Sequence, residues 1–201
     1  MNFDRHLDLG CGLNPRNPYR ASESYGCDIR NLDLAVDKEF TYRQANLVED
    51  PIPFEDDFFD SVSAFDFIEH IPRQAFVKSK GHCNPFIDLM NEIYRVLKPG
   101  GIFVAFSPAY PSPEAFVDPT HVNIITDRTH LYFCSPNPPA SIHGFKGCFE
   151  PINVRREARG NVSNALQSDA RKFFRRLHRR LIGEHFSHIL WELKKCDGKL
   201  I

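Results

Sequence analysis

The sequence predicts an α/β fold in which a parallel β-sheet carries helices on both faces. Two observations support this prediction. Strand and helix signals alternate along the chain, and the first apolar segment, residues 5–9, runs directly into the turn Gly10-Cys11-Gly12. A glycine turn at the carboxyl end of a first strand is where open α/β sheets bind nucleotides. The 201 residues suffice for one domain with a substantial core, which we expect to span residues 1–201.

Six more segments are predicted to be strands, because short apolar or alternating runs are separated by turn-forming or helical sequence. The last of them has Ile189, Trp191 and Leu193 at every second position, which is typical of a final strand at the edge of a sheet. The predicted strands after the first span residues 24–28, 42–45, 59–65, 102–106, 149–155 and 189–193.

The clearest helix signal lies in residues 84–101. Pro85 suits the first helical position, apolar residues at helical spacing supply a broad face, and a Pro-Gly-Gly sequence ends the helix. Residues 126–133 predict a short helix, and residues 163–182 predict a long one. Residues 107–123 are rich in proline and polar side chains, which predicts a long functional loop.

The formal net charge is −1, but the charges are unevenly distributed. Residues 28–60 hold ten acidic side chains, and residues 151–180 hold nine basic ones, most of them on the expected helix 163–182. A solvated helix face explains this pattern, and so does contact with an anionic partner, such as a phosphorylated sugar, nucleic acid or a membrane surface. The basic helix could also cover the active site as an insertion or cap, or form the contact of a homodimer.

The cysteines and the lack of targeting signals indicate the compartment. Six cysteines occur without a Cys-x-x-Cys pair, no leader is evident, and no apolar run is long enough to cross a bilayer. We therefore expect free thiols in a reduced, cytoplasmic setting. Four histidines and cysteines lack the spacing of a recognised zinc site, so no metal is expected there. They are His130, Cys134, His143 and Cys148.

The glycine turn and one acid predict a nucleoside site. Gly10 and Gly12 let backbone N–H groups approach a ligand at a place where a Cβ atom would clash. Asp28 lies 18 residues after Gly10, at an expected strand end, where a carboxylate can accept both ribose hydroxyls. Pro15 stands where a Gly-x-Gly-x-x-Gly sequence has its third glycine, which argues against a dinucleotide.

Five motifs in order make residues 5–135 similar to the class I S-adenosylmethionine-dependent methyltransferases. The match is specific because of the order, since each motif alone is common. The motifs are Leu7-Asp8-Leu9-Gly10-Cys11-Gly12, Tyr25-Gly26-Cys27-Asp28-Ile29, Asn46-Leu47 with residues 51–60, Phe67-Ile68-Glu69-His70, and Arg95-Val96-Leu97-Lys98-Pro99-Gly100-Gly101.

The resemblance implies a Rossmann-like three-layer sandwich, with a mostly parallel seven-stranded sheet whose last strand is antiparallel. It implies S-adenosylmethionine as the cofactor. Asp8 would organise the glycine loop and bind near the amino group, Asp28 would hold the ribose, and Asn46 would meet the adenine amino group. The family commonly has an acid at the position of Asn46, but the asparagine side-chain oxygen can accept the same hydrogen bond. The other implied cofactor contacts are Gly10, Cys11, Gly12, Ile29, Leu47 and Phe65.

Methyl transfer requires an acceptor that is aligned with the sulfonium and a site that excludes water. A histidine near the acceptor can remove its proton at neutral pH. His121, on the loop 107–123, is the first candidate for this base or for positioning the acceptor, although a loop-stabilising hydrogen bond also explains it. His70 is the second candidate, and a packing role that orders the cofactor loop is its simpler interpretation. A divalent ion would need converging carboxylates, which Asp66, Glu69 and Asp118 could supply.

The predicted activity is methyl transfer to a hydroxyl or amine of a polar or anionic small molecule, such as a saccharide. One alternative is a nucleic-acid methyltransferase that uses the basic helix. A second alternative is a catalytically silent cofactor-binding or scaffold protein that keeps the fold.

Overall fold

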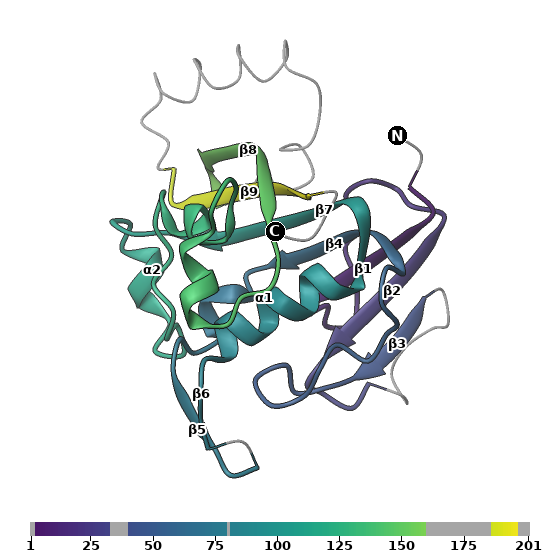
Figure 1. Ribbon diagram of the computed structural model, residues 1–201, viewed down its shortest axis with the longest axis horizontal. Helices are drawn as coiled ribbons and strands as arrows, with labels where there is room; N and C mark the ends of the chain where they lie inside the picture. Colours follow the sequence, from purple (N-terminus) through teal and green to yellow (C-terminus); the bar gives the residue numbers. More distant parts are fainter. Residues whose placement is uncertain (1–2, 33–39, 80, 160–185, 197–201) are drawn as a thin grey trace.

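The computed structural model describes residues 3–32, 40–79, 81–159 and 186–196. Within them, a seven-stranded sheet has the order β3-β2-β1-β4-β7-β9-β8 (Figure 1). Strand β9 is antiparallel to both of its neighbours, and the other strands run parallel to one another. The strands are β1 (Arg5–Leu9), β2 (Glu23–Asp28), β3 (Thr41–Gln44), β4 (Phe59–Phe65), β7 (Leu97–Pro108), β8 (Phe149–Glu157) and β9 (His188–Lys195).

The prediction that the last strand lies at the edge of the sheet is wrong. Strand β9 lies between β7 and β8, so the edge strand is β8. The alternating Ile189, Trp191 and Leu193 belong to the core on one face, but Leu190 belongs to a second apolar cluster on the other face. A strand with apolar residues on both faces is covered on both sides, as a central strand is.

Helix α1 (Pro85–Val96) lies along one face of the sheet (Figure 1). Its buried side chains, among them Met90 and Ile93, pack on the strand residues of the main core. The helix ends at Val96, and β7 begins immediately at Leu97, so the Pro-Gly-Gly sequence lies within an extended segment and not in a separate turn. The helix signal was therefore correct, and its predicted end was several residues too late.

The opposite face has a smaller apolar cluster, to which β4, β7 and β9 contribute Phe65, Ile102, Val104, Phe106 and Leu190. Phe3 and Tyr19 pack on this cluster, and their rings stack with centroids 4.4 Å apart. The first crossover, residues 10–22, consists of turns and contains no helix. The seven-stranded, mostly parallel sheet with the antiparallel β9 and with α1 on one face confirms the predicted α/β, Rossmann-like fold class. The predicted basic helix, residues 163–182, lies outside the described residues.

Between the sheet strands the chain forms short elements. The expected loop 107–123 contains the one-turn helix α2 (Glu114–Val117), and the helix expected at residues 126–133 is the 3₁₀ helix η2 (Thr129–Phe133). The other short elements are η1 (Ile68–His70), η3 (Pro139–His143) and a hairpin of β5 (Ala75–Val77) and β6 (Gly81–Cys83), which projects from the body in Figure 1. Along the described chain, no helix combines the length and apolarity that spanning a bilayer requires.

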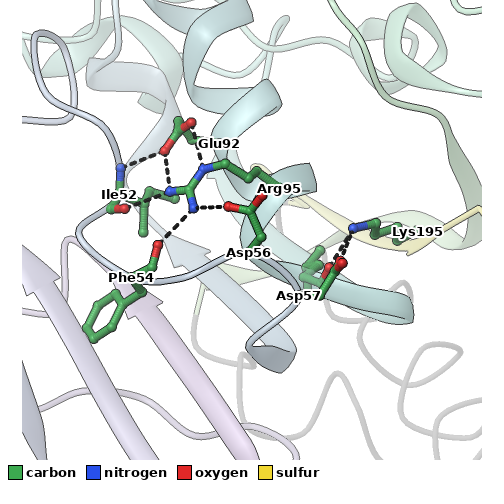
Figure 2. Close-up of polar contacts among 8 residues, drawn as sticks. Ile52, Phe54, Asp56, Asp57, Glu92, Arg95 and Lys195 are labelled. Atoms are coloured by element: carbon green, nitrogen blue, oxygen red, sulfur yellow. Dashed lines mark hydrogen bonds and ion pairs between the residues drawn. The ribbon is translucent and has the colours of Figure 1, made fainter. Parts of the chain in front are cut away.

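Arg95 fixes the segment that leads into β4, as Figure 2 shows. Its guanidinium donates to the backbone oxygens of Ile52 and Phe54, each at 2.8 Å, and to Asp56 Oδ1 at 2.8 Å. It also forms a two-point ion pair with the Glu92 carboxylate at 2.6 and 3.0 Å. A single side chain on α1 therefore satisfies two carbonyls and two carboxylates.

Two lysines also pair with carboxylates at the edge of the sheet where the parallel strands begin, which we call the amino-terminal edge. Lys195 Nζ, at the end of β9, donates to Asp57 Oδ1 and to the Leu97 oxygen, both at 2.6 Å (Figure 2). Lys98 Nζ donates to Asp60 Oδ1 at 2.7 Å. The charges at this edge are thus paired within the protein.

Candidate cofactor and acceptor site

The glycine turn lies at the carboxyl end of β1 and is fastened to β2. Gly10 has φ +67° and Gly12 has φ +58°, which are left-handed conformations that favour glycine. A Cβ atom on Gly10 would also lie 2.5 Å from the ring of Phe67. The N–H groups of Gly10 and Cys11 donate to the Cys27 oxygen at 2.8 and 3.3 Å. These two N–H groups therefore hold the turn against β2, and the contact of the turn with a cofactor stays a prediction.

Asp28, at the end of β2, is 7% exposed and holds four hydrogen bonds. Its carboxylate accepts from the Gly12 N–H at 2.9 Å, from the Arg30 N–H at 3.1 Å, and from the Arg30 guanidinium at 2.9 Å on each oxygen. Burial alone would raise the pKa of Asp28, but the hydrogen bonds from Arg30 and Gly12 hold it below its ordinary value. The predicted ribose acid is thus ionised and covered by an arginine that is itself 58% exposed.

Asp8 fixes the loop that follows the glycine turn. One of its oxygens accepts from the Ser63 hydroxyl at 2.6 Å, and the other accepts from the Arg16 N–H at 2.8 Å. The His6 ring lies between Ser61 Oγ and Ser63 Oγ, at 2.7 and 2.9 Å. Burial raises the pKa of Asp8 to about 6 and lowers the pKa of His6 to about 3, so His6 is neutral at pH 7. These side chains form a buried polar row across β1 and β4.

The Cys11 side chain takes part in packing. Its sulfur would lie 2.6 Å from a Cβ atom on Gly26, so the glycine in β2 makes room for it. Burial raises the pKa of the Cys11 thiol to about 12, which leaves it protonated. The predicted contact of Cys11 with the cofactor stays a prediction, and a thiolate plays no part in it.

The remaining predicted cofactor residues lie around the ends of β2, β3 and β4. Ile29 is 60% exposed beside Asp28, and Leu47 is buried in the main core. Asn46 Oδ1 accepts the Val48 N–H at 3.2 Å, so the atom expected to meet adenine already forms a turn. Phe65 is buried in the smaller apolar cluster, and the Arg16 guanidinium lies 4.9 Å from its ring centre.

The structure brings His70 and His121, which the sequence offered as competing candidates, to one place. Their ring centroids are 4.9 Å apart. One ligand-type atom from each of Glu69, His70 and His121 lies within 4.8 Å of the others. Glu69 and His70 follow β4 in η1, and His121 follows β7, so both elements reach the same edge of the sheet as the glycine turn.

Backbone hydrogen bonds hold the loop of His121 against η1. The Glu69 oxygen accepts the N–H groups of Val122 and Asn123 at 3.0 and 2.9 Å. Asn123 Nδ2 donates to the Ile68 oxygen at 3.0 Å, and its Oδ1 accepts from Arg73 at 2.8 Å. The loop after β7 is therefore anchored on the segment after β4.

The Glu69 carboxyl group is the most unusual member of this cluster. It is 1% exposed, and its Oε2 accepts the Ser107 hydroxyl at 3.0 Å. Among the residues described, no group forms a hydrogen bond with its Oε1. Burial raises the pKa of Glu69 to about 7. A buried acid with one unsatisfied oxygen is typical of functional sites.

The sequence missed two side chains at the cofactor edge, Phe67 and Arg30. Phe67 covers Gly10, and it occurs inside a motif that the sequence had already identified. Arg30 follows Asp28 by two residues, a spacing that allows the observed two-point contact. The four residues considered for zinc do not form a metal-binding group in the described chain. Instead, Cys134 Sγ contacts the His130 oxygen, and Cys148 Sγ lies 3.0 Å from Cys196 Sγ.

Comparison with known proteins bears out the resemblance that the sequence motifs carry. Residues 7–105, just under half of the chain, match the family described as a methyltransferase domain. The match supports both the class I S-adenosylmethionine-dependent methyltransferase resemblance and S-adenosylmethionine as the cofactor.

Individual relatives are distant. The chain is 33% identical to a sterol 24-C-methyltransferase of Schizosaccharomyces pombe over 113 residues, which cover 49% of this chain and 26% of that protein. The chain spans about a third or less of the curated sterol methyltransferases that it matches. A methyltransferase from Archaeoglobus fulgidus superposes with a TM-score of 0.60 at 18% identity, covering 96% of this chain and 86% of the other. Phosphoethanolamine N-methyltransferase 2 of Haemonchus contortus, in complex with S-adenosyl-L-methionine, superposes with a TM-score of 0.55 at 19% identity. The superposition covers 98% of this chain and 50% of the other.

Proposed function

We propose that this protein transfers a methyl group from S-adenosylmethionine to a hydroxyl or amine of a polar small molecule, such as a saccharide. The observation that carries the proposal is the convergence of Glu69, His70 and His121 at the edge of the sheet that also holds the glycine turn and Asp28. A cluster of ionisable groups beside a nucleoside site suits a polar acceptor better than an apolar one.

The residues at the cofactor edge fit S-adenosylmethionine. The glycine turn lies at the carboxyl end of β1 beside Asp28, and the ionised Asp28 can accept two ribose hydroxyls once Arg30 moves aside. Arg30 is mostly exposed, so its displacement needs no rearrangement of the core. Phe67, over Gly10, would cover the methionine part and keep water away from it. The cofactor supplies an already activated methyl group on its sulfonium, so the protein has to bind, align and desolvate.

The acceptor side requires a group that can take a proton. The Nδ1 atom of His121 faces the Ala115 oxygen at 3.3 Å, and a carbonyl can only accept, so Nδ1 carries the hydrogen. The Nε2 lone pair of the neutral ring is then free to receive a proton from an acceptor hydroxyl or amine. His70 lies beside it and would position the acceptor. Nucleic acid remains the alternative acceptor, and the basic segment on which it depends lies outside the described residues.

The cofactor assignment predicts that Asp28→Ala weakens the binding of S-adenosylmethionine about 10–100-fold, because the ribose loses a charged hydrogen-bond acceptor. Isothermal titration calorimetry measures this directly. Asp88→Ala, which removes an exposed acid from α1, is the matched control and should bind as the wild type does. An unchanged dissociation constant for Asp28→Ala would exclude Asp28 from the ribose site.

The acceptor assignment predicts that His121→Ala lowers turnover about 10²–10⁴-fold with little change in cofactor affinity. The assay follows the release of S-adenosylhomocysteine over a panel of sugar, nucleotide-sugar, amine and RNA acceptors. Steep loss of activity with salt would indicate the nucleic-acid alternative. Cofactor binding without turnover on any acceptor would favour the catalytically silent protein, and full activity of His121→Ala would remove this residue from the mechanism.

A further inference from the structure

We propose that Glu69, His70 and His121 form a binding site for one divalent transition-metal ion, with Zn²⁺ as its best probe. The geometry is the first reason. The three ligand-type atoms lie within 4.8 Å of one another, whereas donors on one zinc ion, with bonds of about 2.1 Å, lie about 3–4 Å apart. The two imidazoles are only partly buried, so rotations of these side chains can close the difference.

The orientation of both histidines is the second reason. His70 Nδ1 faces the backbone oxygen of Thr120 at 3.3 Å and the Thr120 hydroxyl oxygen, whose hydrogen is donated to Asp118, at 3.0 Å. His121 Nδ1 faces the Ala115 backbone oxygen at 3.3 Å. Each carbonyl fixes the hydrogen on Nδ1 and leaves the lone pair on Nε2. Metal-binding histidines are typically held in this way, by a carbonyl or carboxylate on the other ring nitrogen. Both rings thus have the tautomer that a ligand requires before any ion arrives.

The unsatisfied Glu69 oxygen is the third reason. The carboxyl group is 1% exposed, and Oε1 has no hydrogen-bond partner among the described residues. A bound cation would provide the missing partner for Oε1.

The donor set selects the kind of ion. Two imidazole nitrogens with one carboxylate suit Zn²⁺, Fe²⁺ or Co²⁺, whereas Mg²⁺ and Ca²⁺ prefer oxygen donors. Asp118 Oδ2 lies 3.9 Å from His121 Nε2 and is the nearest additional carboxylate to that nitrogen. Three protein ligands leave a coordination position for an exchangeable molecule.

The catalytic consequence rests on the proposed function, although the metal site does not. An acceptor hydroxyl bound at the open position would lose its proton to water more easily, because the cation stabilises the oxyanion. The oxygen then forms a bond to the methyl carbon, the carbon–sulfur bond breaks, and its electron pair stays on sulfur to give the neutral thioether. In this arrangement, His121 holds the ion and does not take the proton itself.

The test measures metal binding without cofactor or acceptor. Protein stripped with EDTA and desalted is titrated with Zn²⁺ in the calorimeter and with Co²⁺ in the spectrophotometer. We expect one ion per chain, with Co²⁺ bands of nitrogen and oxygen ligation and no thiolate charge-transfer band. Glu69→Gln, His70→Ala and His121→Ala should each weaken binding at least about tenfold. His143→Ala, which removes an exposed histidine from η3, should leave it unchanged.

Unchanged affinity in the three variants, with their folding verified by circular dichroism, would overturn the proposal. Thiolate bands that disappear in Cys148→Ser would overturn it as well, since they would assign the ion to the pair Cys148–Cys196. Failure of the proposed function has a different signature. Zn²⁺ would then bind as expected while no acceptor is methylated, whereas failure of the metal site alone leaves turnover insensitive to EDTA.

Discussion

The two edges of the parallel strands use their charges in opposite ways. At the amino-terminal edge, Arg95, Lys98 and Lys195 each have carboxylate partners within 3 Å, and the segment before β4 is fixed to α1. At the carboxyl-terminal edge, Glu69 has an oxygen without a hydrogen bond from any described residue, and Asp28 is covered by an exposed arginine. Charge pairs that tie elements together stabilise the fold. An oxygen without a partner, as in Glu69, or a carboxylate covered by an exposed side chain, as in Asp28, is available to a ligand.

The amino-terminal edge is expected to depend on Arg95 for its stability. We expect Arg95→Ala to lower the free energy of unfolding by about 2–4 kcal/mol, because two carbonyls and two carboxylates lose their donor. Urea denaturation measures the change. Cofactor affinity, which belongs to the other edge, should be nearly unaffected in the folded fraction. Arg5→Ala removes a more exposed ion pair and should change stability by less than about 1 kcal/mol. Equal effects of the two variants would contradict the contrast between the edges.

At the carboxyl-terminal edge, the contribution of Glu69 to stability is expected to depend on pH. Its pKa is about 7 in the folded protein and near 4.5 when the chain is unfolded, so the folded state binds more protons between these values. Stability contributed by this group is therefore lost as the pH rises from about 4.5 to 7. In metal-free buffer, Glu69→Gln should gain about 1–3 kcal/mol relative to the wild type between pH 5 and 7.5.

The midpoints of urea denaturation at pH 5 and at pH 7.5 measure this gain in stability. Glu55→Gln removes an exposed glutamate and serves as the control, which should follow the wild type. A constant difference between Glu69→Gln and the wild type across the pH range would show that Glu69 is ionised in the folded protein throughout.

The smallest of these effects is expected for a substitution of Arg30 at the carboxyl-terminal edge. The arginine competes with the ribose for Asp28, but it is 58% exposed, so its contact is worth less than about 1 kcal/mol. Arg30→Ala should therefore tighten S-adenosylmethionine binding by up to about fivefold, most clearly at low salt. Calorimetry at two ionic strengths measures the change. Weaker binding in the variant would mean that Arg30 contacts the cofactor directly.

Much of the fold could be predicted because it depends on local signals. Strand β1 with its buried leucines, the glycine turn and the helix start at Pro85 are encoded by neighbouring residues, and the structure has each of them. The place of β9 between β7 and β8 could not be predicted, since strand order depends on pairing between segments far apart in sequence. The hairpin β5–β6 was missed because its strands are only three residues long.

The candidate site, too, could be predicted from the sequence only in part. Asp28 could be found because a motif and a strand end coincide, and its pairing with Arg30 was missed because motif spacing says nothing about side-chain competition. His70 and His121 could each be named, but their proximity depends on β4 and β7 being parallel neighbours. The special position of Glu69 depends on burial and an unmet hydrogen bond, which appear only in three dimensions.

The buried polar row beneath the glycine turn has an evolutionary consequence. If Asp8 is ionised, Ser63 must donate to it, the Ser63 oxygen must accept from His6 Nε2, and His6 Nδ1 must accept from Ser61. The hydrogens in this row thus all point one way. Replacing one member by an apolar residue leaves its neighbour without a hydrogen-bond partner inside the protein. Descendants of this sequence should therefore exchange these four residues together or not at all.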